Sequence, residues 1–173
     1  NLLFIADDAG ISSFNLEDGT VTSLVVNPGD KAPYIPLSAD DAGYVLLSRM
    51  ADDDHRELAW FNITDHKLKT IEGGLELGCA LEAVTTEPGE VLIASSSGEC
   101  AGEDMQNGLY RLDLGSGEIA NLAGLVGEDI NGLSLSPEAD QLLFVNDGTI
   151  NLLALADQAF EPIAGLPDGT VMS

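Results

Sequence analysis

Short apolar runs alternate with turn-forming residues along the whole chain. Four nine-residue segments share aliphatic residues at positions one and nine, an apolar residue at position six, and small or polar residues between. These segments are LEDGTVTSL from Leu16, ITDHKLKTI from Ile63, LGSGEIANL from Leu114 and LADQAFEPI from Leu155. Turn chemistry in the middle of each segment and alternation on its flanks predict a β-hairpin.

Two further series of strands precede these hairpins. Apolar strand cores occur as LLF at Leu2, YVLL at Tyr44, EVLI at Glu90 and QLLF at Gln141. The segments IPLSADDAG, AVTTEPG and LSLSPEAD precede the last three cores and indicate a strand followed by a tight acidic turn. Each repeat therefore contains four strands, A to D. Repeats of about 40 to 50 residues with four short strands are typical of β-propeller blades.

The repeats predict one all-β domain, a β-propeller built from four-stranded antiparallel blades over residues 1–173. The predicted blades are residues 1–29 together with 170–173, then 33–74, 80–126 and 130–168. Two architectures stay open. The two chain ends could complete one blade and close a four-bladed ring, or the chain could form part of a six- to eight-bladed ring. We favour the larger ring, because four blades lie at the low end of the known range.

Two segments carry a resemblance to a known family. LSLSPEADQLLF resembles the SPDG turn and following strand of TolB-like and WD-like propeller repeats, and NGLYRLDLGSGEIANL resembles strands C and D with their turn. The resemblance extends from Leu2 through Ile163, although no copy has the complete SPDG and blade lengths vary. It implies the propeller fold. It does not select a function, because such propellers serve as scaffolds, ligand binders and non-catalytic domains of peptidases.

The charge balance is strongly acidic. Thirty Asp and Glu residues against six Lys and Arg give a net charge of -24. Phosphate backbones and anionic membrane surfaces would be repelled, so we expect neither nucleic acid nor an anionic membrane as partner. Hydrophobic residues make up 45% of the chain, which argues against disorder. Such acidity suits an extracellular, cell-surface or periplasmic protein, with a halophilic cytoplasm as the alternative.

The predicted binding face lies where the B-to-C and D-to-A connections meet, because these connections share one end of every blade and include the long loops. Long loops on a rigid scaffold often carry function. We expect this acidic face to receive a protein partner or a cationic ligand, while the oligomeric state is not predicted. Its candidate residues are Asp7, Asp8, Asp52, Asp53, Asp54, Glu57, Glu103, Asp104, Glu128 and Asp129.

Two further sites are predicted on the same face. Residues 51–57, ADDDHRE, form the densest carboxylate run, and Asp52, Asp53 and Asp54 are candidate calcium ligands because calcium prefers clustered oxygen atoms. The spaced Asp pattern of a calcium loop is absent, so an ordinary solvated loop is the alternative. Cys79 and Cys100 fall on one face, which predicts a disulfide if their Cα atoms come within about 7 Å. Two unpaired thiols are the other possibility.

No catalytic residue is predicted. The sequence has neither a Gly-x-Ser-x-Gly elbow nor a His-Glu-x-x-His motif, and His55 and His66 fall on opposite faces. Trp60 and Tyr110 are interpreted as packing between blades rather than as a ligand platform. The sequence therefore favours a non-catalytic binding module. The alternatives are the propeller domain of a larger enzyme, such as a prolyl-oligopeptidase-like peptidase with its catalytic residues elsewhere, and a structural calcium-binding propeller.

Overall fold

The computed structural model describes most of the chain, and all regular structure in the described part is β-strand. The described residues are 2–26, 32–40, 42–50, 56–71, 77, 80–96 and 106–163. Their strands form four antiparallel sheets, called blades 1 to 4 here, and each blade consists of strands that are consecutive in sequence. No helix in this part of the chain is long and apolar enough to span a membrane.

The strands have the following bounds. Blade 1 contains β1 (Leu2–Asp7), β2 (Gly10–Asn15) and β3 (Val21–Val26). Blade 2 contains β4 (Ile35–Ala39), β5 (Tyr44–Met50), β6 (Arg56–Asn62) and β7 (Lys67–Thr70). Blade 3 contains β8 (Ala80–Glu87), β9 (Glu90–Ser96), β10 (Gly108–Asp113) and β11 (Ile119–Val126). Blade 4 contains β12 (Ile130–Leu135), β13 (Gln141–Asn146), β14 (Thr149–Ala154) and β15 (Ala159–Pro162).

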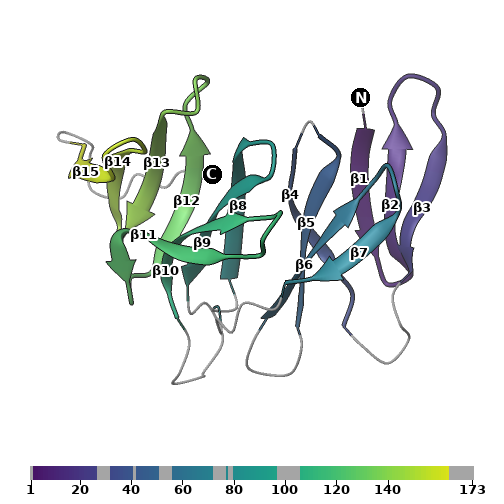
Figure 1. Cartoon of the computed structure of the whole chain (residues 1–173), viewed down its shortest axis with the longest axis horizontal. Helices are drawn as coiled ribbons and strands as arrows, with labels where there is room; N and C mark the ends of the chain where they lie inside the picture. The colour runs from purple at the N-terminus through teal and green to yellow at the C-terminus, as the bar shows by residue number, and fades with distance from the viewer. Residues whose placement is uncertain are drawn as a thin grey trace.

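This arrangement confirms the predicted fold class. Blades 2 to 4 are four-stranded antiparallel sheets, and blade 1 has three strands among the described residues. The blades lie side by side in chain order, with blade 1 and blade 4 at the two ends of the row (Figure 1). Their first strands adjoin, because β1 contacts β4, β4 contacts β8 and β8 contacts β12. Because the strands of each blade pair in sequence order, the last strand of each blade lies farthest from these contacts.

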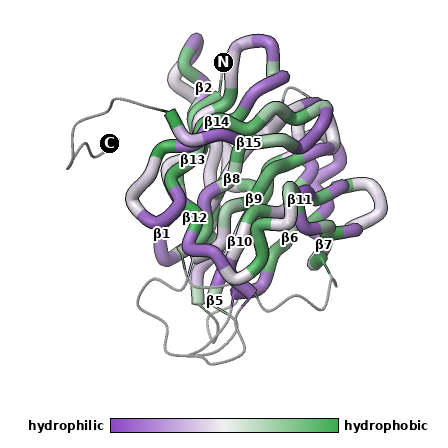
Figure 2. The backbone as a smooth tube through the Cα atoms, turned by 90° about the vertical axis from the view of Figure 1, so that its left-hand side faces the viewer, coloured by the Kyte–Doolittle hydropathy of each residue, from purple (hydrophilic) through white to green (hydrophobic). Residues whose placement is uncertain are grey.

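The core lies between the blades rather than within one layer. On β9, Val91 and Ile93 pack towards blade 2, whereas Leu92 and Ala94 pack towards blade 4. Because the strand is buried on both faces, its sequence is continuously apolar instead of alternating. Hydrophobic stretches accordingly follow β9 and β13 (Figure 2). Inter-blade packing therefore sets both the fold and the relative positions of the surface connections.

One face of strand β1 has no neighbouring blade in the described structure and is largely exposed. Leu3 is 52% exposed and Ile5 is 45% exposed, although both belong to an apolar strand. Phe4 lies on the other face of β1 and packs against the cluster between blades 1 and 2. The two faces of the same strand therefore differ in burial because only one of them meets another described blade.

Candidate functional site

The strand ends that the long connections join lie at one end of the blades, the lower end in Figure 1. Between the described strands, the longest connections are residues 27–34, 71–79 and 97–107, and all three join strands at this end, called the loop end here. At the opposite end, called the turn end, the longest are residues 16–20, 114–118 and 136–140. The fold therefore joins its strands by longer connections at the loop end, where the sequence predicted the binding face, than at the turn end.

Four of the predicted carboxylates are exposed at the loop end, at the end of β1 and in the short β1–β2 and β11–β12 connections. Asp7 Oδ1 accepts hydrogen bonds from the backbone N–H groups of Ala9 and Gly10 at 2.9 and 3.1 Å, so it shapes its own turn. Asp129 Oδ1 accepts one from Asn107 Nδ2 at 2.8 Å, which links the β9–β10 connection of blade 3 to the connection between blades 3 and 4. The other two exposed carboxylates are Asp8 and Glu128.

Glu57 is more buried than these four residues and pairs with a buried cation. Arg49 donates to Glu57 Oε2 from Nε at 3.0 Å and from Nη2 at 2.7 Å. The side chains are 7% and 23% exposed, and the Arg49 guanidinium lies 4.6 Å from the ring centroid of Tyr34. Burial raises the pKa of Tyr34 above its ordinary value. Glu57 thus anchors Arg49 inside blade 2, and its predicted part in binding stays a prediction.

The remaining predicted residues lie outside the described part of the chain, so the calcium site and the disulfide stay predictions. They are Asp52, Asp53, Asp54, Glu103, Asp104, Cys79 and Cys100. Within the described ranges, no group of three His, Cys, Asp or Glu residues is arranged to hold a metal ion.

The structure adds one carboxylate that the sequence interpretation missed. Ile130 pairs with Asn146 across β12 and β13, and this register brings the residue after Asn146, Asp147, close to the connection that precedes Ile130. Asp147 is exposed, as are Glu128 and Asp129 in that connection. The tight β13–β14 turn could have been assigned to the loop end from strand order alone, because it is a B-to-C connection.

Carboxylates at the turn end are built into tight turns. Asp113 Oδ1 accepts hydrogen bonds from the Ser116 backbone N–H at 2.6 Å and from Ser116 Oγ at 2.9 Å. These bonds, the backbone one first, lower the pKa of Asp113 below its ordinary value of 3.8. Asp18 is held by Thr20 in the same way, chiefly through the Thr20 hydroxyl, and its pKa is also lowered. These carboxylates define the shape of the turns that they occupy.

The Asp113 turn predicts a pH dependence of stability. A pKa that is lower in the folded state contributes stability above the unfolded pKa, and the contribution is lost as pH falls through 3.8 towards the folded value. We therefore expect D113N, which keeps an acceptor oxygen but cannot titrate, to lose less stability than the wild type between about pH 5 and about pH 3. Urea unfolding at both pH values measures this difference. Equal losses in the two proteins would contradict it.

A pocket of about 580 Å³ opens between blades 2 and 3. Its lining residues are Trp60, Leu68, Lys69, Thr70, Ile71, Ser116 and Gly117. Trp60 packs edge-to-face on Tyr44 with ring centroids 5.2 Å apart, as expected for a residue between blades. Its indole Nε1, however, is buried without a hydrogen-bond partner in the described structure. Packing between blades therefore explains the position of the Trp60 ring. It does not provide a hydrogen-bond acceptor for the indole N–H group.

Tyr110 behaves as the sequence predicted. It is 2% exposed and belongs to the cluster between blades 2 and 3. Its hydroxyl donates to backbone carbonyl oxygens, with Tyr110 Oη lying 3.1 Å from the oxygen of Asn107 and 3.3 Å from that of Gln106. Burial raises the pKa of this hydroxyl. Tyr110 is a core residue with a satisfied polar group.

The chain is similar to known proteins in its three-dimensional structure. No protein-family model matches the chain, and no curated protein matches it in sequence. TolB from Acinetobacter baumannii superposes with a TM-score of 0.64 at 15% identity, covering 93% of this chain and 40% of that one. A chain of the nidogen/laminin complex gives 0.63 at 15% identity, covering 93% and 60%. The fold is that of a TolB-like β-propeller.

An enzyme shares this propeller fold. Oligogalacturonate lyase in complex with manganese superposes with a TM-score of 0.65 at 11% identity, covering 96% of this chain and 50% of that one. The chain thus spans 40%, 60% and 50% of the three structures, which is less than two thirds of each. At these identities the similarity establishes the fold alone, because one fold hosts unrelated activities.

Proposed function

We propose that this chain is a non-catalytic β-propeller binding module whose loop end receives a protein partner with a basic surface. One observation carries the proposal. The longest connections between the described strands, residues 27–34, 71–79 and 97–107, all join strand ends at the loop end. A rigid scaffold that joins its strands by long connections on one face is a common arrangement of a recognition surface.

Charge indicates the kind of partner. The net charge of -24 attracts a basic surface over long range and increases the rate of encounter. Glu128, Asp129 and Asp147 converge at the loop end of blade 4 and supply local acidic contacts. The nidogen/laminin structure, in which a similar fold is assembled with another protein, supports a protein partner. An exported or cell-surface location is part of the same proposal.

Matched neutralisation of charge at the two ends tests the proposal with a deca-lysine peptide as probe. The variant D8N/E128Q/D147N removes three charges from exposed residues at the loop end, and E17Q/E118Q/E138Q removes three from turns at the other end. If each lost ion pair with the peptide contributes about 0.5 kcal/mol to binding, the affinity of the first variant for the peptide falls about tenfold. We expect a fall of less than about twofold in the second, because only long-range attraction is lost.

Fluorescence polarisation of the labelled peptide at physiological ionic strength measures both affinities. Circular dichroism of the two variants confirms that each keeps its β-structure. Equal losses of affinity in the two variants would show that the probe responds to total charge, and the loop end would then not be the recognition surface.

A further inference from the structure

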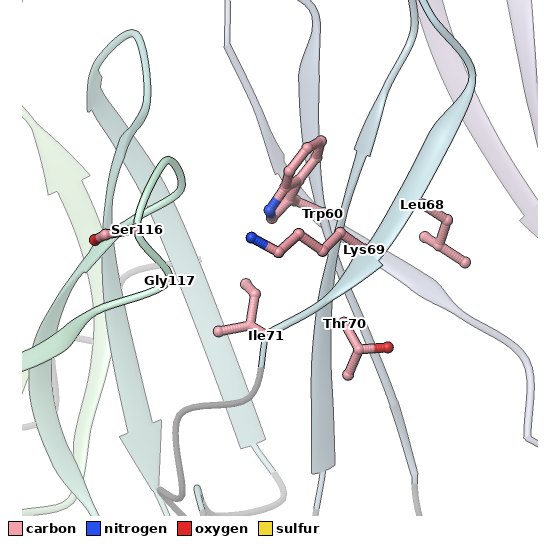
Figure 3. A pocket seen from close by; sticks show the side chains of 7 residues that line it. All are labelled: Trp60, Leu68, Lys69, Thr70, Ile71, Ser116 and Gly117. Atoms are coloured by element: carbon pink, nitrogen blue, oxygen red, sulfur yellow. The ribbon is translucent and has the colours of Figure 1, made fainter.

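The pocket between blades 2 and 3 has two walls that belong to different blades. Trp60, Lys69 and Ile71 form the wall on blade 2, and Ser116 and Gly117 of the β10–β11 turn form the wall on blade 3 (Figure 3). Gly117 has φ of +79°, and a Cβ there would lie 3.9 Å from Ile71 Cγ2. The pocket is distinct from the loop end, because its blade 3 wall is a connection at the turn end.

Two hydrogen-bond donors on blade 2 point into the space between the walls. Trp60 Nε1 and Lys69 Nζ both face the blade 3 turn (Figure 3). The Lys69 ammonium lies over the Trp60 ring, 5.9 Å from the ring centroid, so the cation is beside the indole. Trp60 Nε1 is buried without a hydrogen-bond partner in the part of the chain that the structure describes. A buried donor of this kind calls for an acceptor.

The other polar side chains of the lining already have partners. Ser116 Oγ donates to Asp113 Oδ1 at 2.9 Å and accepts from the Glu118 backbone N–H at 3.1 Å. Thr70 Oγ1 donates to Glu57 Oε1 at 3.1 Å and points away from the pocket (Figure 3). The lining contains no Asp or Glu, although the chain has 30 of them. The pocket therefore offers an N–H donor and a cation with no competing carboxylate among its lining residues.

We propose that this pocket binds a carboxylate group carried on a flat or apolar body. The carboxylate accepts hydrogen bonds from Trp60 Nε1 and the Lys69 ammonium, and the body packs against Ile71 and the indole. A carboxylate fits these donors because it has two acceptor oxygens and a charge that strengthens each bond. The negative charge of the protein opposes entry only weakly at physiological ionic strength, where fields are screened within about 8 Å.

Lys67 provides a matched control for the proposed role of Lys69. The two lysines lie two residues apart on β7, and both are exposed. Lys67 Nζ is paired with Asp65 Oδ2 at 2.9 Å, and Lys67 does not line the pocket. Replacing either lysine with methionine removes one positive charge and keeps a long aliphatic side chain. Only K69M removes a donor from the pocket.

The single tryptophan of the chain gives a direct signal for the experiment. The indole N–H of Trp60 produces one cross-peak in a ¹⁵N–¹H correlation spectrum, which is followed during titration with benzoate or with benzamide, its neutral analogue. We expect benzoate to shift this peak with a Kd at least about tenfold lower than that of benzamide. K69M should weaken benzoate binding about tenfold, whereas K67M should change it less than about twofold.

Three results would overturn the proposal. The first is an indole peak that does not move with benzoate. The second is equal binding of benzoate and benzamide, which would mean that the pocket recognises the ring alone. The third is an equal effect of K69M and K67M, which would mean that benzoate responds to overall charge.

Discussion

Replacement of Phe144 by alanine is expected to lower the free energy of unfolding by about 4 kcal/mol. Phe144 is 0% exposed and belongs to the cluster that joins blades 3 and 4. Its ring also packs edge-to-face on Phe160, with centroids 5.8 Å apart. Because this cluster connects two blades, truncation creates a cavity at their interface. Urea denaturation monitored by circular dichroism measures the change.

The control for this prediction is Leu3→Ala on β1. Leu3 is 52% exposed, so its truncation should change stability by less than about 0.5 kcal/mol. Similar losses in F144A and L3A would contradict the conclusion that inter-blade packing supplies the core.

Replacement of Gly108 by alanine is the second substitution with a large expected effect, a loss of about 3 kcal/mol or more. Gly108 begins β10 at φ of +142°, and a Cβ there would overlap the carbonyl oxygen of Leu125 on β11. The β10–β11 register shifts between Gly108 and Tyr110, so the close approach of the two backbones is part of an irregularity in the blade. Alanine would force these two strands apart.

Gly19→Ala separates backbone strain from steric overlap. Gly19 has φ of +74°, and a Cβ there would meet nothing within 4 Å. We expect G19A to cost about 1 kcal/mol, from its left-handed conformation alone. Thermal and urea unfolding of both variants gives the comparison. If G108A were as mild as G19A, the β10–β11 contact would be looser than the structure shows.

The sequence predicted the architecture well because each strand is marked twice. Apolar cores such as EVLI at β9 mark the buried strands, and turn residues such as Gly117 and Gly19 mark the hairpins. These signals are local, so the strands can be recognised even though the blades differ in length. They do not determine how many blades complete a ring, because that depends on the angle between neighbouring blades.

The candidate sites were less predictable because they depend on register and on pairing between blades. Glu57 was predicted as part of a binding face, and only the structure shows that it pairs with Arg49. Trp60 was predicted to pack between blades. Only the structure shows that its indole N–H lacks a hydrogen-bond partner, and that Lys69 and the β10–β11 turn line the same pocket. No local sequence pattern marks a pocket whose two walls come from different blades.

Carboxyl footprinting with the deca-lysine peptide tests whether the loop end is the recognition surface. Carbodiimide coupling labels exposed carboxylates, and mass spectrometry compares labelling with and without the peptide. We expect protection of Asp8, Glu128, Asp129 and Asp147 at the loop end, with no protection of Glu138 and Asp157 in the turns at the other end of blade 4. Protection confined to Glu138 and Asp157, or shared equally by both ends, would contradict it.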